Sequence, residues 1–278
     1  RTFGVTASGH SSMKNIFIKI HKVIEKTKHR STANRVKLRP IDCLDIANII
    51  GENVVVGGVR RTAEIVLIDQ DDKECIQAKS ELYKKIDEKW VIDTEIAHRQ
   101  MSNNSIYYTR KPTRPELHWH LQQMRYSGEP GWVNEAAGAK RRPNFQGVNP
   151  CAEILLDSKG LCNLTTVNVM GFVKDGVLDR TGLMETQRLS ARAGYRMTCT
   201  ELEIPEWNAI QQRDKLLGCS LTGWQDLVNA LKLDKDEQKE LLRELKETAR
   251  KAAAEYAKEL GQAEPLLVTT IKPEGTLS

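Results

Sequence analysis

The chain has 278 residues, with 42 Lys and Arg against 37 Asp and Glu, which gives a formal net charge of +5. Hydrophobic residues make up 40% of the sequence and charged residues 28%, which is ordinary for a soluble globular protein with a sizeable core. No apolar run approaches the roughly 18 residues of a membrane-spanning helix, and the mild positive charge suits phosphate binding without requiring nucleic acid.

The six cysteines are too few for a disulfide scaffold, and none forms the C-x-x-C pair typical of a structural zinc ribbon. We therefore expect free thiols in a reducing, cytoplasmic compartment. Most of these thiols are expected to be buried and inert.

The first third of the chain predicts two helices and a strand–loop–strand unit. The first helix should carry its apolar face on Ile16, Ile20, Val23 and Ile24. A second helix is expected across IDCLDIANIIG, ending near Gly51. Its apolar stripe would comprise Cys43, Ile46, Ala47 and Ile50, which makes Cys43 a buried structural thiol. In VVVGGVRRTAEIVLI, β-branched runs on both sides of the glycine pair predict two strands joined by a loop.

The rest of the chain alternates between predicted strands and helices. DDKECIQAKSELYKKI is expected to be helical, SNNSIYYT to enter a strand, and RPELHWHLQQMRYSG to form a helix. The β-branched segment LCNLTTVNVMGFV predicts a strand, and helical periodicity recurs over 181–196, 206–218 and 235–260. The last helix should start with a capping box at Asp234 and Glu237 and stop at Gly261. Its expected apolar face comprises Leu242, Leu245, Ala249, Ala252, Tyr256 and Leu260.

This alternation indicates an α/β fold with a largely parallel, buried sheet. No repeat or low-complexity linker divides the chain, so residues 1–278 are expected to form one domain. The chain begins with Arg and stops in the turn-like segment IKPEGTLS, which predicts that it is part of a longer protein.

The stretch NPCAEILLDSKGLCN, residues 149–163, is the part of the sequence most open to chemical interpretation. Pro150 disfavours a helix and biases Asn149 toward extended geometry. In an extended chain Asn149, Cys151 and Glu153 would project from one face, within reach of one small ligand. The excursion before Cys162 can make a hairpin or a protruding loop.

The residues alone leave the role of this stretch open. A carboxylate beside a thiol can act as general base on a substrate hydroxyl that the Asn149 amide also binds. From spacing alone, a structural turn with two unrelated thiols is favoured over such a site. A Cys–His hydrolase would need an imidazole near Cys151, and the nearest histidines, His118 and His120, lie on a helix whose periodicity already explains them.

NPCAEI followed by LCNL resembles the thiyl-radical loop and adjoining strand of class II, adenosylcobalamin-dependent ribonucleotide reductases, in particular the ribonucleoside-triphosphate reductase type. Other segments match this family in order along essentially the whole chain: GVTASG, DIANIIGENVVVGGVRRTAEI, SNNS, GEPGWVN and IKPEGT. The resemblance implies part of a ten-stranded α/β barrel with a radical-bearing finger loop at its centre. Residues 1–278 would be a partial catalytic domain, with N- and C-terminal parts of the full protein lying outside it.

The resemblance also implies a role for each matching residue of the stretch. Cys151 would carry the thiyl radical that removes hydrogen from C3′ of the ribose. Glu153 would take the 3′-hydroxyl proton, and Asn149 would bind that hydroxyl. Cys162 would be one of two cysteines that reduce the substrate and end as a disulfide. Its partner, and the C-terminal cysteines that re-reduce the pair, would lie outside this chain.

Two glycine-containing loops complete the implied site. GGVRRTA resembles the loop that relays effector identity to the substrate base; its implied residues are Gly57, Gly58, Val59, Arg60 and Arg61. KPEGTLS resembles the turn that holds the substrate phosphates; its implied residues are Gly275, Thr276 and Ser278. The sequence departs from the family pattern at Ala152, where Gly is common, at Glu274, where a small polar residue is common, and at His10, where Pro is frequent.

The resemblance implies adenosylcobalamin as cofactor, a ribonucleoside triphosphate as substrate, a deoxynucleotide effector, a thioredoxin-type reductant and a monomeric full-length enzyme. No metal-ligating residue is predicted, and neither nucleic acid nor a membrane is an expected partner. Two alternatives stay open. One is a class I-type large subunit that takes its radical from a partner subunit, and the other is a non-catalytic nucleotide-binding module.

Overall fold

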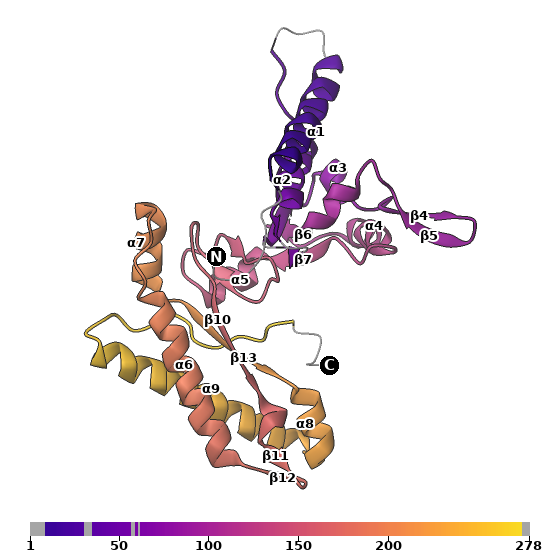
Figure 1. Ribbon diagram of the computed structural model, residues 1–278. Coiled ribbons are helices and arrows are strands. Elements are labelled where there is room, and N and C mark those ends of the chain that lie inside the picture. The colour runs from indigo at the N-terminus through magenta and orange to yellow at the C-terminus, as the bar shows by residue number, and fades with distance from the viewer. Residues whose placement is uncertain (1–8, 31–34, 57–58, 61, 274–278) are drawn as a thin grey trace. The chain divides into compact units, whose positions relative to one another are not determined.

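The chain folds into two compact units, Arg1–Arg141 and Arg142–Ser278, each with its own parallel strands and its own core (Figure 1). The computed structural model describes residues 9–30, 35–56, 59–60 and 62–273. The sequence shows no signal at the boundary between the units, and the expectation of one domain over residues 1–278 stays a prediction. None of the described helices is long and apolar enough to cross a membrane.

Two helices begin the first unit, α1 (Gly9–His29) and α2 (Pro40–Asn53). Both were predicted, and the expected apolar face of α1 is its half-buried side. A buried hydrogen bond joins the two helices, since Thr27 Oγ1 donates to Asp42 Oδ2 at 3.0 Å. Pro40 occupies the first turn of α2, where its missing N–H costs nothing.

The predicted apolar stripe of α2 is wrong. Cys43, Ala47 and Ile50 are exposed, whereas α2 buries Ile41, Asp42, Leu44, Asn48, Ile49 and Gly51. The helix has apolar residues on two sides, and packing selects the side that meets the sheet. A polar residue is accepted on that side because Asn48 Nδ2 donates to the Leu44 carbonyl at 2.8 Å. Cys43 is therefore an exposed thiol.

Parallel strands form the sheet of the first unit, in the order β3-β6-β7. Their bounds are Glu64–Asp69 for β3, Ser102–Tyr108 for β6 and Gly131–Asn134 for β7. The predicted strands in TAEIVLI and SNNSIYYT are thereby confirmed. Helix α4 (Arg114–Met124) starts with a capping box between Thr113 and Glu116, and α5 (Glu135–Arg141) closes the unit. The core comprises Ile41, Leu44, Ile68, Cys75, Ile76, Ala78, Ile106 and Tyr108.

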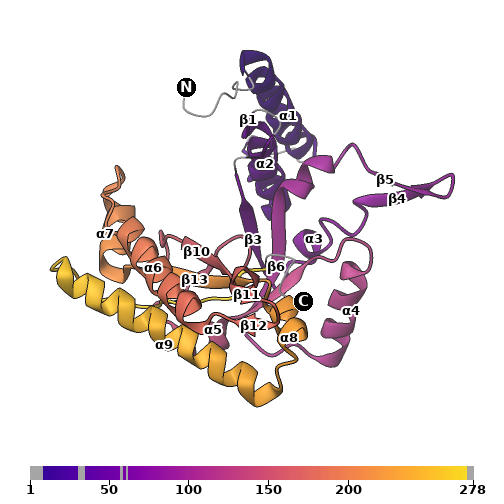
Figure 2. The same ribbon diagram turned by 60° about the horizontal axis from the view of Figure 1, so that its bottom comes forward.

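The helix predicted across DDKECIQAKSELYKKI is mostly absent. Only α3 (Lys73–Ile76) is helical, and the chain then forms a hairpin of β4 (Tyr83–Ile86) and β5 (Lys89–Ile92). Asp87 and Glu88 make the two-residue turn with φ of 47° and 63°, as a turn matching the strand twist requires. The hairpin projects from the rest of its unit (Figures 1 and 2), and the 3-10 helix Ala97–Met101 (η1) leads from it into β6.

The second unit is built on a parallel pair, β10 (Asn163–Asn168) and β13 (Leu217–Thr222). The chain near Val268 extends this pair on the far side of β13. There the Cys219 N–H donates to the Val268 carbonyl at 2.7 Å, and the Thr270 N–H donates to the Cys219 carbonyl at 3.1 Å. The parallel pairing in both units confirms the predicted α/β class.

Short elements and four helices complete the second unit. They are η2 (Val169–Phe172), β11 (Val173–Lys174), β12 (Val177–Leu178), α6 (Arg180–Thr198), α7 (Pro205–Asp214), α8 (Trp224–Leu231) and α9 (Lys235–Glu259). Helix α6 packs on β10 and β13 and lies beside α9 (Figure 2). The helix predicted over 206–218 is too long, because Lys215 adopts a left-handed conformation with φ of 45° and the chain turns into β13.

Helix α9 has the predicted ends. The Asp234 carboxylate accepts from the N–H groups of Asp236 and Glu237 at 2.8 and 2.9 Å, and Gly261 follows the last turn with φ of 63°. The predicted apolar face of α9 is confirmed at Leu245, Ala249 and Ala252, which are buried. The prediction is wrong at the start of the helix. Leu242 is 38% exposed, whereas Leu241, outside the predicted face, is 4% exposed.

Candidate active site

A tight hairpin carries the predicted radical cysteine. Its strands are β8 (Gly147–Val148) and β9 (Leu155–Leu156), paired antiparallel. Its turn lies before residues 154–160, the excursion for which the sequence allowed a hairpin or a protruding loop. Asn149 closes the loop from the inside. Its N–H donates to the Ile154 carbonyl at 3.2 Å, and its side-chain Oδ1 accepts from the Ile154 N–H at 2.9 Å. The loop geometry thus depends on one buried amide side chain.

The expectation that Asn149, Cys151 and Glu153 project from one face of an extended chain is wrong. The loop is a turn, in which the Ala152 N–H donates to the Asn149 carbonyl at 2.8 Å. Pro150 favours this geometry, because its fixed φ suits the second position of a turn as well as an extended chain. The turn directs the Asn149 side chain into the protein and leaves Cys151 exposed.

Ala152 has a left-handed backbone, with φ of 64°. That conformation costs an L-residue about 1–2 kcal/mol, whereas glycine adopts it freely. The departure from glycine noted in the sequence therefore falls on the residue of this loop where glycine would relieve strain.

Glu153 has a carboxylate without a partner. Both side-chain oxygens are buried, and neither has a hydrogen-bond partner among the residues that the structure describes. The backbone around it is fixed, since Thr270 Oγ1 donates to the Glu153 carbonyl at 2.7 Å. A buried acceptor normally finds a donor in the native state, so this carboxylate is suited to receive one from a ligand.

Cys162 lies against the inner side of the same loop. Asn149 Nδ2 is 3.5 Å from Cys162 Sγ. Burial, followed by the nearby charges of Glu153 and Cys151, raises the pKa of the Cys162 thiol to about 11, although Asn149 and Lys272 act in the opposite direction. The structure therefore brings Asn149, Glu153 and both cysteines together, and all six cysteines of the chain are free thiols.

We predict slow alkylation of Cys162. A pKa of about 11 in place of 9.0 lowers the thiolate fraction near neutral pH about 100-fold, and the thiolate is the reacting form. Iodoacetamide labelling followed by peptide mass spectrometry should show Cys162 reacting at least about 100 times more slowly than the exposed Cys43. The Cys162 rate should still be rising at pH 10. Equal rates for both thiols at pH 7.5 would contradict the burial.

The two other predicted loops lie largely outside the described residues. Gly57, Gly58 and Arg61 are not described, and for Val59 and Arg60 the structure gives only the backbone strand β2 (Val59–Arg60), paired with β1 (Val55–Val56). The phosphate-binding residues Gly275, Thr276 and Ser278, and the neighbouring Glu274, also lie outside. Both assignments stay predictions.

The histidine that a Cys–His hydrolase would need has a structural partner. His120 is buried in the first unit, and its Nδ1 lies 2.6 Å from the Tyr108 hydroxyl. Burial lowers the pKa of His120, which favours the neutral ring. These contacts support the interpretation that helix periodicity explains this residue.

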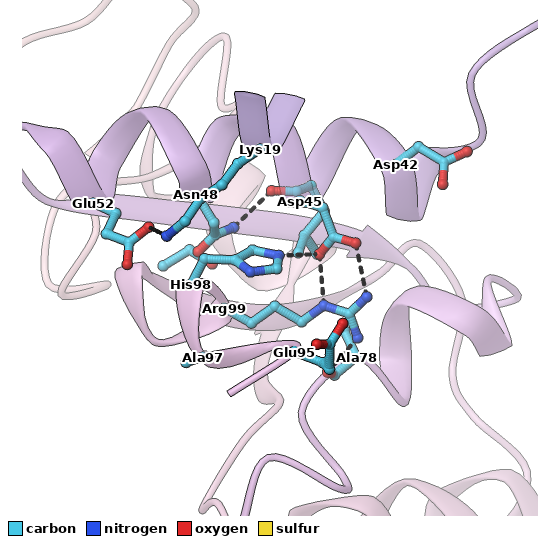
Figure 3. A network of polar contacts seen from close by, with 12 residues as sticks. Lys19, Asp42, Asp45, Asn48, Glu52, Ala78, Glu95, Ala97, His98 and Arg99 are labelled. Carbon is cyan, nitrogen blue, oxygen red and sulfur yellow. Dashed lines mark hydrogen bonds and ion pairs between the residues drawn. The ribbon is translucent and has the colours of Figure 1, made fainter. Parts of the chain in front are cut away.

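A polar network in the first unit gave no signal in the sequence. Asp45 on α2 accepts hydrogen bonds from Arg99 Nε at 2.6 Å and Nη2 at 2.9 Å, and its Oδ1 lies 2.9 Å from His98 Nε2 (Figure 3). Burial by itself would raise the pKa of Asp45, but the hydrogen bonds from Arg99 and His98 outweigh it and lower the pKa to about 2. The network borders a cavity of about 350 Å³ beside α1 and α2.

Replacing Asp45 with asparagine should destabilise the protein by about 1–2 kcal/mol at pH 7, after allowance for solvent screening. The carboxylate's contribution is present above its unfolded pKa, near 3.8, and is lost as pH falls toward 2. The difference between wild type and D45N should therefore shrink between about pH 4 and 2 in urea titrations. Glu88→Gln, at an exposed ion pair, is the control and should change stability by less than about 0.5 kcal/mol.

Comparison with known protein families identifies the fold. Residues 80–266 match the family model described as ribonucleotide reductase, barrel domain. A solved structure of a B-12 dependent (class II) ribonucleotide reductase superposes with a TM-score of 0.73 and 25% identity, covering 99% of this chain and 40% of that one. The alpha subunit of the Actinobacillus ureae class Id ribonucleotide reductase shares the fold, with a TM-score of 0.58 and 14% identity over 96% of this chain and 57% of that one.

Curated relatives agree with this match. The adenosylcobalamin-dependent ribonucleoside-triphosphate reductase of Lactobacillus leichmannii is 28% identical over 99% of this chain and 39% of its own length. The protein of the same name from Lacticaseibacillus paracasei is 30% identical over 81% of this chain and 28% of its own length. The chain thus spans about two fifths of the length of the first of these relatives.

These matches confirm the predicted fold class and the predicted family resemblance. The chain covers part of the family's barrel, and its described strands form separate short sheets without closing one. The family match runs across the boundary between the two units, from residue 80 to residue 266. The chain therefore belongs to the ribonucleotide reductase barrel-domain family.

Proposed function

We propose that the protein reduces ribonucleoside triphosphates to deoxyribonucleotides by a thiyl-radical mechanism that depends on adenosylcobalamin. The observation that carries the proposal is the buried carboxylate of Glu153, which has no hydrogen-bond partner among the described residues. It shares a closed loop with the exposed Cys151 and lies near the half-buried Cys162. The names of the relatives support the choice of triphosphate and cofactor.

In this proposal Cys151 removes the hydrogen atom from C3′ of the ribose. An exposed position suits that role, because the thiol must be reachable both by the ribose and by the source of the radical. Glu153 accepts the proton of the 3′-hydroxyl through a carboxylate oxygen that no described residue contacts as a hydrogen-bond donor. Asn149 uses Oδ1 to hold the loop and one Nδ2 hydrogen toward Cys162, which leaves the other Nδ2 hydrogen for the 3′-hydroxyl.

Cys162 would supply reducing equivalents with a second thiol outside this chain. The two thiols give up two electrons and two protons and join as a disulfide, while the 2′-hydroxyl leaves as water. The raised pKa supports this role, because it keeps Cys162 in the protonated form that can protonate the leaving hydroxyl.

Adenosylcobalamin, when bound, would supply the radical that Cys151 carries. The exposed Cys151 thiol fits such a cofactor, since hydrogen-atom exchange requires direct approach to the sulfur. The protein's own contribution is to hold the Cys151 thiol on a closed loop and to bury the Glu153 carboxylate oxygens.

The remaining assignments belong to the same proposal. Residues 57–61 would transmit the identity of a deoxynucleotide effector to the substrate base, and Gly275, Thr276 and Ser278 would hold the substrate phosphates. A thioredoxin-type dithiol would restore the reduced state in a full-length monomer. The six free cysteines support a reducing, cytoplasmic compartment.

The proposal is tested by incubating the intact protein that carries this chain with adenosylcobalamin, a dithiol and a ribonucleoside triphosphate, without a second protein. Deoxynucleoside triphosphate should form, and omission of the cofactor should stop the reaction. Activity only after addition of a radical-bearing subunit would favour the class I alternative. Salt-sensitive binding to DNA without nucleotide turnover would favour a non-catalytic module.

A further inference from the structure

Four charged side chains form a continuous network in the second unit. Arg142 Nη2 donates to Asp214 Oδ2 at 2.5 Å, and Arg213 Nε donates to Asp214 Oδ1 at 2.7 Å. Arg213 Nη2 then donates to Asp157 Oδ2 at 2.7 Å. Two guanidinium groups and two carboxylates make the network neutral overall, and one residue, Asp214, accepts from both arginines.

The network joins both ends of the hairpin that carries Cys151. Arg142 precedes β8 in the sequence, and Asp157 directly follows β9. Both side chains meet the same pair, Arg213 and Asp214, at the end of α7. The entry and exit of the loop are therefore fixed to one point of the surrounding structure.

The end of α7, where Arg213 and Asp214 lie, leads directly into the strand pair next to Cys162. After Asp214 the chain enters β13, whose first residue, Leu217, pairs with Asn163, the residue after Cys162. The Asp214 carbonyl accepts from the Leu266 N–H at 2.9 Å. This hydrogen bond joins the chain segment that runs beside β13 near Val268 to the end of α7. The network thus connects the Cys151 hairpin to the strand pair of β10 and β13, which begins directly after Cys162.

Asp157 also shapes the turn between β9 and Cys162. Its Oδ1 accepts from the Ser158 N–H at 2.7 Å, and its carbonyl accepts from the Gly160 N–H at 3.0 Å. Gly160 fits this turn because an added Cβ would lie 3.0 Å from the Asp157 carbonyl oxygen. A single carboxylate therefore links the turn to Arg213.

The buried end of the network has no alternative partner in the described part of the chain. Arg142 is fully buried, and its Nε and Nη1 have no hydrogen-bond partner there. Burial would raise the pKa of Asp214, but hydrogen bonds from Arg213 and Arg142 outweigh it and keep the pKa below its usual value. Removal of one partner from such a buried pair leaves the other charge uncompensated.

We propose that the network consists of positioning residues, which hold the two ends of the Cys151 hairpin against the strand pair of β10 and β13, directly after Cys162. These residues are Arg142, Asp157, Arg213 and Asp214. Their effect on catalysis rests on the proposed function, whereas their effect on loop geometry does not. The network acts at a distance from the substrate, through the loop that Asn149, Cys151 and Glu153 occupy.

The test removes the exposed part of the network in the full chain, where the fold should tolerate it. Arg213 is 45% exposed and Asp157 13%, so Arg213→Gln and Asp157→Asn cut the tether while Arg142 and Asp214 stay paired. Iodoacetamide labelling should show Cys162 reacting at least about tenfold faster in both variants. Buried Cys219, in the neighbouring strand, should keep its rate within about twofold. Arg188→Gln, at an exposed ion pair on α6, is the matched control and should change neither rate.

Two further variants separate positioning from general weakening of the fold. The double variant R213Q/D157N should label no faster than R213Q alone, because D157N acts only on the Arg213–Asp157 contact that R213Q already removes. Arg213→Lys retains one donor and should restore at least half of the lost protection. Unchanged Cys162 labelling in R213Q and D157N would overturn the proposal, as would an equal rise at Cys162 and Cys219. If R213Q loses its circular dichroism signal, the near-isosteric D157N decides the outcome.

Turnover supplies the second readout, in the intact protein. We expect R213Q and D157N to lower kcat at least about tenfold and to leave KM within about twofold, since a misplaced reacting group slows chemistry more than binding. Unchanged kcat with faster labelling would overturn the catalytic part of the inference. A wild-type protein that reduces no ribonucleotide would overturn the proposed function, while the labelling result would still decide the positioning role.

Discussion

Replacing Cys151 with serine is expected to abolish ribonucleotide reduction, with a loss of at least about a thousandfold in kcat. A serine hydroxyl keeps the size of the side chain, but its O–H bond is too strong to give a radical that exchanges hydrogen with a ribose C–H bond. The measurement is deoxynucleotide formation by the intact protein with adenosylcobalamin and a dithiol. The fold should be unaffected, because Cys151 is exposed and the loop is closed by hydrogen bonds of Asn149 with Ala152 and Ile154.

Cys43→Ser is the matched control for this substitution. Its thiol is also exposed, but it lies on α2, in the unit that does not contain Asn149, Cys151, Glu153 and Cys162. Turnover by C43S should stay within about twofold of wild type. Wild-type turnover by C151S would contradict the thiyl-radical assignment, whatever the behaviour of the control.

Replacing Leu241 with alanine is expected to cost about 2–5 kcal/mol of unfolding free energy. Leu241 is 4% exposed, and it packs in the core cluster with Val167, Leu183, Leu227 and Leu245. The substitution removes three buried carbon atoms and leaves a cavity between α9 and its neighbours. Urea denaturation followed by circular dichroism measures the change.

Leu242→Ala tests the register of α9 against the adjacent residue. Leu242 has the same side chain on the same helix but is 38% exposed, so its replacement should cost less than about 1 kcal/mol. Equal losses for the two variants, or a larger loss for L242A, would mean that the helix presents the face expected from the sequence.

Features with a local physical cause could be predicted from the sequence. The ends of α9 follow from a carboxylate that accepts N–H groups at Asp234 and from a glycine that tolerates positive φ at Gly261. The strand SNNSIYYT follows from β-branched and aromatic residues, which favour an extended chain. The family could be predicted because its motifs occur in order along the chain.

Features that depend on which surfaces meet could not be predicted from the sequence. Helix α2 has apolar residues on two sides, and only contact with the sheet shows that Leu44 is buried and Cys43 exposed. The hydrophobic pattern of residues 83–92 is weak. A two-residue turn with positive φ at Asp87 and Glu88 makes this segment a hairpin. The extended course expected for residues 149–153 is wrong because proline also suits the second position of a turn.

The sequence by itself determined the α/β class and the family, since these depend on local residue patterns and on motifs that occur in order along the chain. The residues of the proposed site came from the resemblance to that family. Only the tertiary structure decided how that site is held. Arg142 and Asp214 are 72 residues apart, and Arg213 and Asp157 are 56 apart, so no local pattern joins them. That the Glu153 carboxylate is buried, without a hydrogen-bond partner among the described residues, is likewise visible only in the folded chain. Burial and pairing of charges are properties of surfaces that meet, and the order of residues does not contain them directly.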